Sequence, residues 1–208
     1  MNEPGPLTIF TIGHSTHDYE RFLGLLRSAG VSALADVRTA PYSRHLPHFN
    51  ADALKAELRR DAIAYSFLGK ELGGRPSGRQ FYCNGVADYE KMAAAKEFLQ
   101  GLERVTEGAQ KYRIALMCSE QDPLDCHRCL LAGRALAQRG VVVKHILSDG
   151  QTATQPEIEI QLLELSGHGH EDLLATREER LTLAYRARSR KVAFAEADAS
   201  ADSAVAAE

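Results

Sequence analysis

Apolar runs alternate with segments of helical periodicity along most of the chain. Five runs predict buried strands, at residues 7–12, 33–37, 63–68, 112–117 and 141–147. Between them, apolar residues spaced by three and four positions predict helices over residues 18–29, 50–60, 87–106 and 126–139. Strands that alternate with helices predict an α/β fold: a single domain with a mainly parallel sheet flanked by helices.

The connections and the C-terminal region complete this prediction. Residues 38–49 and 69–85 read as long polar loops, and Asn50 and Asp125 are positioned to cap the helices that follow them. Beyond the α/β domain at 1–150, residues 156–165 and 171–190 predict added helices, so that 151–191 form a helical extension. Residues 192–208, rich in Ala and Asp, predict a disordered acidic tail.

Length, hydropathy and cysteine content indicate in which cellular compartment the protein is expected. The 208 residues suit one domain, and no stretch reaches the roughly 18 apolar residues of a membrane span. The first residues lack the pattern of a secretory signal, so we expect a cytoplasmic protein without a membrane partner. Three of the four cysteines fall between residues 118 and 129, which in a reducing compartment favours chemistry, metal binding or plain burial over disulfides.

Charge points to one region of the chain. The net charge is -3, so the whole protein is not a general attractor for nucleic acid. Residues 38–79, however, carry eight Lys and Arg against four Asp and Glu. We therefore expect any anion site to lie in this segment.

Polar motifs follow four of the predicted strands. They are Gly13-His14-Ser15, Asp36-Val37-Arg38, the segment 69–75, and Cys118-Ser119-Glu120. Open α/β sheets bind ligands outside the carboxyl ends of their strands, so these four motifs predict a shared site.

The segment 118–129 holds the sharpest chemical signal. Cys126, His127 and Arg128 open a predicted helix, whose free N–H groups favour an anion and would depress the pKa of the Cys126 thiol. Arg128 could grip a carboxylate or phosphate through two parallel hydrogen bonds, and Glu120 could serve as a general base.

Several of these motifs together resemble the domain-of-unknown-function 488 family. The residues concerned are Thr11-Ile12-Gly13-His14-Ser15, Asp36-Val37-Arg38, Pro41, Ser43-Arg44, Phe49-Asn50, Leu72-Gly73-Gly74-Arg75, Cys118, Glu120, Pro123 and Cys126-His127-Arg128. The resemblance runs from about Thr8 to about Leu147 and implies no particular activity, cofactor or substrate.

The order of elements around Cys118 is distantly similar to that of rhodanese-type sulfurtransferases. A strand ending in Cys118 is followed by a loop, a helix and another strand. The loop departs from that pattern, because it contains Glu120, Asp122 and Asp125 and neither Gly nor Arg. Three acids would repel a persulfide and raise the pKa of Cys118, so we treat this likeness as an analogy.

The motifs yield two sets of candidate site residues. The candidate catalytic residues are His14, Glu120, Cys118, Cys126 and His127. The candidate ligand-binding residues are Ser15, Asp36, Arg38, Arg44, Arg75, Arg128, Tyr42 and Phe49.

Each candidate also has a purely structural interpretation. The cysteines can simply pack in the core, Asp36 can pair with Arg38, and the arginines can form intramolecular ion pairs. Cys118, Cys126, His127 and Cys129 could also be four zinc ligands, but their spacing lacks two close ligand pairs, so no metal site is predicted.

Three functions remain open from the residues alone. The first is a strand-end pocket that binds an anionic ligand, such as a nucleotide or nucleic acid, with acid–base chemistry. The second is cysteine-dependent sulfur transfer or thiol redox chemistry. The third is a non-enzymatic module that binds nucleic acid or a protein. The sequence identifies no cofactor and no oligomeric state.

Overall fold

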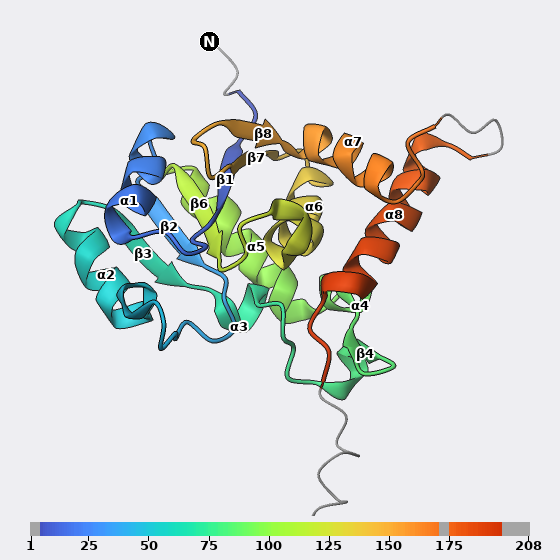
Figure 1. Ribbon diagram of the computed structural model, residues 1–208, viewed down its shortest axis with the longest axis horizontal. Helices are drawn as coiled ribbons and strands as arrows, with labels where there is room; N and C mark the ends of the chain where they lie inside the picture. Colours follow the sequence, from blue (N-terminus) through green and yellow to red (C-terminus); the bar gives the residue numbers. More distant parts are fainter. Residues whose placement is uncertain (1–4, 171–174, 197–208) are drawn as a thin grey trace, which may run out of the picture.

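The computed structural model describes residues 5–170 and 175–196 and confirms the α/β prediction (Figure 1). A six-stranded sheet has the order β3-β2-β6-β1-β7-β8. Its strands are β1 (Thr8–Gly13), β2 (Ala33–Asp36), β3 (Ala64–Phe67), β6 (Ile114–Cys118), β7 (Val142–Ile146) and β8 (Thr152–Thr154). The first five of these strands run parallel, and β8 joins β7 antiparallel. The carboxyl ends of five strands therefore meet at one edge.

Helices cover both faces of the sheet. They are α1 (Tyr19–Ser28), α2 (Ala51–Arg60), α3 (Gly69–Leu72), α4 (Tyr89–Ala93), α5 (Lys96–Ala109), α6 (Arg134–Ala137), α7 (Gln155–Leu165) and α8 (Arg177–Val192). A π-helical segment, Arg128–Gly133, leads directly into α6. Apolar residues of α1 and α2 pack on one face, and those of α5, α6, α7 and α8 pack on the other. No helix in the described part of the chain is long and apolar enough to cross a membrane.

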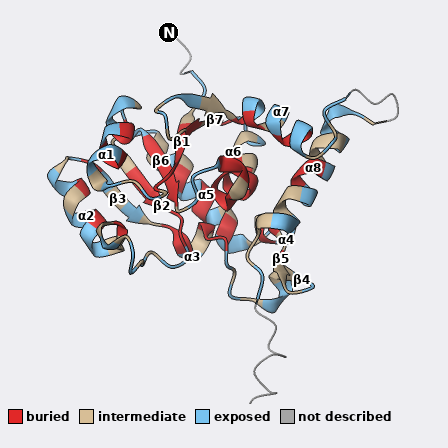
Figure 2. Cartoon of the chain, viewed as in Figure 1, coloured by how far each residue is buried: buried red, intermediate tan, exposed pale blue. Residues whose placement is uncertain are grey.

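Strand β6 shows how the sequence divides its side chains between these two faces. Ile114, Leu116 and Cys118 join the core on the α5 side, whereas Ala115 and Met117 join the core under α1 and α2. All five are buried, as Figure 2 shows for the central strands. This alternation follows from the period of two in a strand, and it turns Cys118 toward the segment that carries Cys126, just before the π-helical turn.

Both predicted caps were wrong in their contacts. Asn50 occupies the N-cap position of α2, but its side chain makes no cap hydrogen bond and instead accepts from the backbone N–H of Ser43 at 2.7 Å. Asp125 ends a 3₁₀ turn, Pro123–Asp125, whose N-terminal cap is Asp122. The Asp125 carboxylate pairs with Arg188 of α8, so it ties the C-terminal helix to this turn.

The loop and tail predictions also need correction. Residues 69–85 contain α3, a 3₁₀ turn (Arg79–Phe81) and β4 (Tyr82–Cys83), which forms a hairpin with β5 (Val86–Ala87). The tail was predicted to be disordered from residue 192, yet Phe194 accepts a hydrogen bond from the backbone of Ala87 at 2.9 Å. Residues 171–174 of the last predicted helix and 197–208 of the tail lie outside the described residues.

Candidate functional site

A pocket of about 890 Å³ opens at the carboxyl edge of the parallel strands. Nine of the thirteen predicted site residues line it: His14, Ser15, Arg38, Tyr42, Arg75, Cys118, Glu120, Cys126 and His127. The loops after β1, β2, β3 and β6 thus converge as expected from the topology. Arg44, Asp36, Phe49 and Arg128 are not among the lining residues.

Gly13 allows the loops after β1 and β6 to run side by side. The backbone N–H groups of His14 and Ser15 donate to the carbonyls of Cys118 and Ser119, both at 2.9 Å. A Cβ atom on Gly13 would lie 1.9 Å from the carbonyl oxygen of Glu120, so only glycine fits there. Ser15 takes a left-handed backbone conformation with φ of 49°, which is uncommon outside glycine and marks a tightly constrained loop.

Asp36 and Arg38 form a buried ion pair beneath the pocket. One carboxylate oxygen of Asp36 accepts from the backbone N–H and Nε of Arg38, and the other accepts from Nη2 at 2.6 Å. The hydroxyl of Tyr65 also donates to Asp36, at 2.9 Å. Since the Asp36 side chain has no exposed surface, it orients Arg38 and cannot itself touch a ligand in the pocket.

His14 is held between Arg38 and its own loop. Nδ1 lies 2.8 Å from the carbonyl oxygen of Ser15, so Nδ1 donates and Nε2 is left to accept from Arg38 Nη1 at 3.3 Å. Burial is the main cause that lowers the pKa of His14 to about 4, so the ring is neutral at pH 7. The ring also stacks on Phe49 with centroids 4.3 Å apart, which explains why Phe49 lies under the site.

The mouth of the pocket is formed by long, exposed side chains from separate loops. Arg75 is exposed, and its guanidinium lies 4.6 Å from the centre of the Phe194 ring. Tyr42 is 69% exposed, and Glu120 is exposed on the opposite loop. Arg44 is exposed on the same loop as Tyr42 without lining the pocket.

Arg128 supports the loop after β6 and does not line the pocket. The side chain has no exposed surface, and its two terminal nitrogens donate to the carbonyl oxygens of Glu120 and Gln121 at 2.5 and 2.8 Å. Its charge still acts on the buried groups nearby. The structure therefore places Arg128 among the residues that hold the loop and not among those that line the pocket, and its predicted contact with a ligand stays a prediction.

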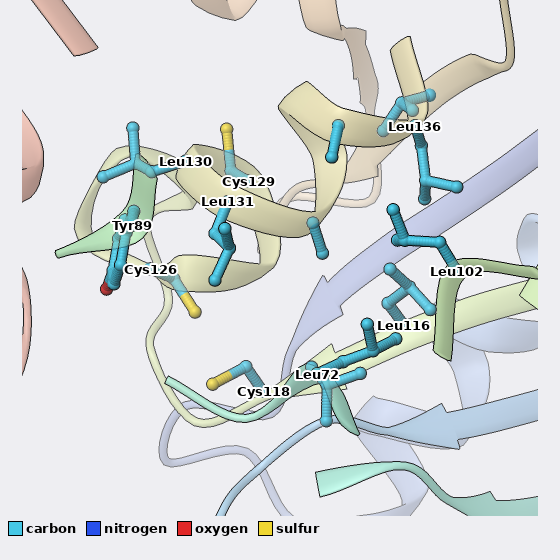
Figure 3. Packing of buried hydrophobic residues seen from close by; sticks show 14 of the residues in the cluster. Leu72, Tyr89, Leu102, Leu116, Cys118, Cys126, Cys129, Leu130, Leu131 and Leu136 are labelled. Atoms are coloured by element: carbon cyan, nitrogen blue, oxygen red, sulfur yellow. The ribbon is translucent and has the colours of Figure 1, made fainter. Parts of the chain in front are cut away.

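Cys118, Cys126 and His127 meet on the inner wall of the pocket. His127 Nδ1 lies 3.7 Å from the sulfur of Cys118 and 3.8 Å from that of Cys126. Both thiols face the same space in Figure 3, and both residues are almost fully buried. His127 Nε2 lies 3.0 Å from the carbonyl oxygen of Val37, so Nε2 carries a hydrogen and Nδ1 presents its lone pair to the sulfurs.

The two thiols differ in acidity. A hydrogen bond to Cys126, together with burial, raises the pKa of Cys118 well above its ordinary value. Burial alone would also raise the pKa of Cys126, but the hydrogen bond from Cys118 and the charge of Arg128 lower it well below that value. Of the two thiols, Cys126 is therefore the one that more readily carries a negative charge.

Sequence reasoning missed several residues of the pocket. Tyr89 lines it from α4, Val192 from the last position of α8, and Phe194 from just beyond that helix. Their only signal in the sequence is an apolar side chain at the end of a polar segment. Gly74 belongs to the Leu72-Gly73-Gly74-Arg75 motif, and it leaves room for the His127 ring, because a Cβ atom there would lie 2.7 Å from His127 Nδ1.

The fold and the pocket define an α/β protein with a pocket at the carboxyl edge of its parallel strands. The chain belongs to the family described as Domain of unknown function DUF488, whose sequence model matches residues 18–135. Searches of curated proteins and of solved structures returned no match. The matched segment includes Arg38, Arg75 and the Cys118–His127 region, whereas His14 and Phe194 lie outside it.

Proposed function

We propose that the pocket binds an anionic ligand of nucleotide size, with Arg38 and Arg75 as anchors for a phosphate or carboxylate group. The observation that carries this proposal is the meeting of two guanidinium groups, from the loops after β2 and β3, in one pocket of about 890 Å³. Small-molecule sites typically enclose about 300–1,000 Å³. The pocket therefore has room for a mononucleotide.

Arg38 is held in place while part of its donor capacity stays free. Its Nε and Nη2 donate to Asp36, Nη2 also donates to the carbonyl oxygen of Phe49, and Nη1 donates to His14. A guanidinium has five N–H groups, so one N–H of Nη1 remains without a partner among the described residues. A fixed donor of this kind binds an oxyanion with little loss of side-chain entropy.

Arg75 supplies the charge that is not already neutralised. Within the described ranges, it forms no ion pair, and the ring of Phe194 restricts its position. Tyr42, exposed at the same mouth, offers a flat surface on which a base can stack, an interaction worth about 1–3 kcal/mol. Phosphate anchors and a stacking surface together favour a nucleotide over a simple carboxylate.

Glu120 is the candidate for acid–base catalysis in this pocket. Both ring nitrogens of His14 are engaged, with Ser15 and Arg38, so His14 positions Arg38 and has no free nitrogen for proton transfer. Glu120 is exposed, lines the pocket, and its carboxylate makes no hydrogen bond in the described part of the chain. We therefore assign Glu120 as the proton acceptor for any reaction of the bound ligand.

The test is thermal unfolding of the full chain with AMP, inorganic phosphate and a short single-stranded oligonucleotide as probes. AMP at about 100 times its Kd should add about 2.7 kcal/mol of stability, and raise Tm by about 5–10 °C. Arg75→Gln should remove this stabilisation. Arg79→Gln is the matched control, because Arg79 is exposed on the same loop but does not line the pocket.

Two outcomes would contradict the proposal. One is that neither AMP nor phosphate stabilises the wild-type chain. The other is that Arg75→Gln and Arg79→Gln respond to AMP alike. Stabilisation by the oligonucleotide alone, with a steep salt dependence, would instead support a nucleic-acid binding module.

Cysteine-dependent sulfur transfer has weaker support. The lowered pKa of Cys126 favours it, but Cys118 and Cys126 are only 6% and 2% exposed. The loop between them carries Glu120 and Asp122, whose negative charges would repel a persulfide, and its Glu120 and Gln121 carbonyls accept from Arg128. Slow iodoacetamide labelling of both thiols in the folded chain would argue against this alternative.

A further inference from the structure

We propose that Cys118, Cys126 and His127 bind one zinc ion, with a fourth coordination position open to the pocket. The three residues come from the end of β6 and from the segment that enters the π-helical turn. Their two sulfurs and Nδ1 all lie within 4.8 Å of one another. This proposal stands apart from the nucleotide proposal, because it depends on the inner wall of the pocket and not on its arginines.

The two sulfur–nitrogen distances are close to those around a tetrahedral zinc ion, and the two sulfurs lie within 4.8 Å of each other. Zn–S bonds of about 2.3 Å and Zn–N bonds of about 2.0–2.1 Å, at tetrahedral angles, place sulfur and nitrogen about 3.6 Å apart. The corresponding distances from His127 Nδ1 are 3.7 Å to Cys118 and 3.8 Å to Cys126. Three ligand atoms at this spacing need only small side-chain rotations to share one ion.

The surroundings orient the ligands as in a metal site. His127 donates its Nε2 hydrogen to the carbonyl oxygen of Val37, which fixes the ring and leaves Nδ1 for coordination. The backbone N–H of Arg128 donates to the sulfur of Cys126 at 3.5 Å. Gly74 leaves space beside Nδ1, since a Cβ atom at this position would lie 2.7 Å from that nitrogen.

Cys129 does not belong to this set, which separates the proposal from a closed four-ligand site. The Cys129 sulfur lies on the other side of its helical turn from the Cys126 sulfur (Figure 3). It contacts the side-chain amide of Gln155, whose Nε2 is 3.6 Å away. With three protein ligands that all line the pocket, the fourth position faces the cavity, as in zinc sites that bind water or a ligand.

Charge balance also favours zinc here. Metal-bound thiols are deprotonated, so Zn²⁺ with two thiolates and a neutral imidazole forms a centre without net charge. Such a centre suits a wall on which the three residues are at most 9% exposed. It would also leave the positive charge of Arg75 available to the ligand in the pocket.

The direct test is the metal content of the full chain, purified under reducing conditions without chelators. Elemental analysis should find one zinc per chain in the wild type and in Cys83→Ser, a control in which an exposed cysteine is replaced. Cys118→Ser and Cys126→Ser should lose the zinc. Loss of an outer-shell partner lowers metal affinity by about 10- to 100-fold, so loss of a ligand should lower it by more than about 100-fold.

Cobalt substitution of the wild-type chain provides a readout that does not depend on whether the variants fold. Co²⁺ added to the metal-free chain should produce thiolate-to-cobalt charge-transfer bands and the intense visible bands of a tetrahedral ion, and Zn²⁺ should displace it. A reduced wild-type chain that takes up neither metal would overturn the proposal. So would equal zinc affinity in the wild type and the folded Cys126→Ser variant. Because no nucleotide is present, failure here is separate from failure of AMP binding.

Discussion

Replacement of Asp36 by Ala should strongly destabilise the protein, because it leaves the Arg38 guanidinium buried without its counter-ion. The Asp36 side chain has no exposed surface and that of Arg38 is 5% exposed. The carboxylate accepts three hydrogen bonds from Arg38 and one from Tyr65. After the substitution, Arg38 keeps only the Phe49 carbonyl and the His14 ring as partners.

Breaking a buried ion pair by removing one partner costs about 3–5 kcal/mol. In a chain of this size, each kcal/mol lowers Tm by about 2–4 °C, so the expected fall in Tm is about 6–20 °C. The same substitution at Glu57 is a suitable control, since its ion pair with Arg60 has side chains 40% and 72% exposed. Loss of such a surface pair costs about 0–1 kcal/mol.

Urea unfolding followed by circular dichroism measures both effects. The double variant Asp36→Ala/Arg38→Met should regain part of the lost stability, because an apolar replacement of the whole pair leaves no charge unpaired. The reasoning is refuted if Asp36→Ala costs no more than Glu57→Ala. It is also refuted if the double variant loses the sum of the two single losses.

Two further perturbations test the loop packing and the core. Gly13→Ala should cost about 1–3 kcal/mol or more in urea unfolding, because its Cβ atom would meet a loop carbonyl, whereas Gly24→Ala, with open space, should be neutral or stabilising. Burial lowers the pKa of His145 from 6.5 to about 4. The stability that the neutral His145 ring contributes is therefore fully present above pH 6.5 and is lost as the pH falls toward 4, by about 3 kcal/mol in total. His145→Gln should reduce the fall in urea midpoint between pH 7 and 4.5; an unchanged fall would contradict this origin.

The sheet and the position of the site could be predicted because both depend on periodic signals. Apolar runs of strand length place β1, β2, β6 and β7, and parallel strands must bring their carboxyl ends to one edge. The short strand β8 was missed, because three residues, Thr152–Thr154, are too few to show a period. The hairpin of β4 and β5 was missed for the same reason.

The roles of individual arginines could not be predicted, since each role depends on where the partner oxygens lie. Arg38, Arg75 and Arg128 are alike in the sequence, and each follows or precedes a polar loop. In the structure, Arg128 is closed off by two backbone carbonyls eight and seven residues away, and Arg38 is held by a carboxylate two residues away. Arg75 meets the ring of Phe194, which is 119 positions further along the chain.

The same dependence on geometry separates the proposed zinc site from the spacing of its residues in the sequence. Spacing in the sequence made Cys118, Cys126, His127 and Cys129 a poor zinc motif, because four ligands were counted along the chain. The fold turns the Cys129 sulfur away and brings the other three side chains to the spacing of a three-ligand site. A three-ligand site needs no pair of close ligand pairs, since its fourth position belongs to water or to a bound ligand. The rule that argued against a structural zinc site therefore has no force against a zinc site of the open, catalytic type.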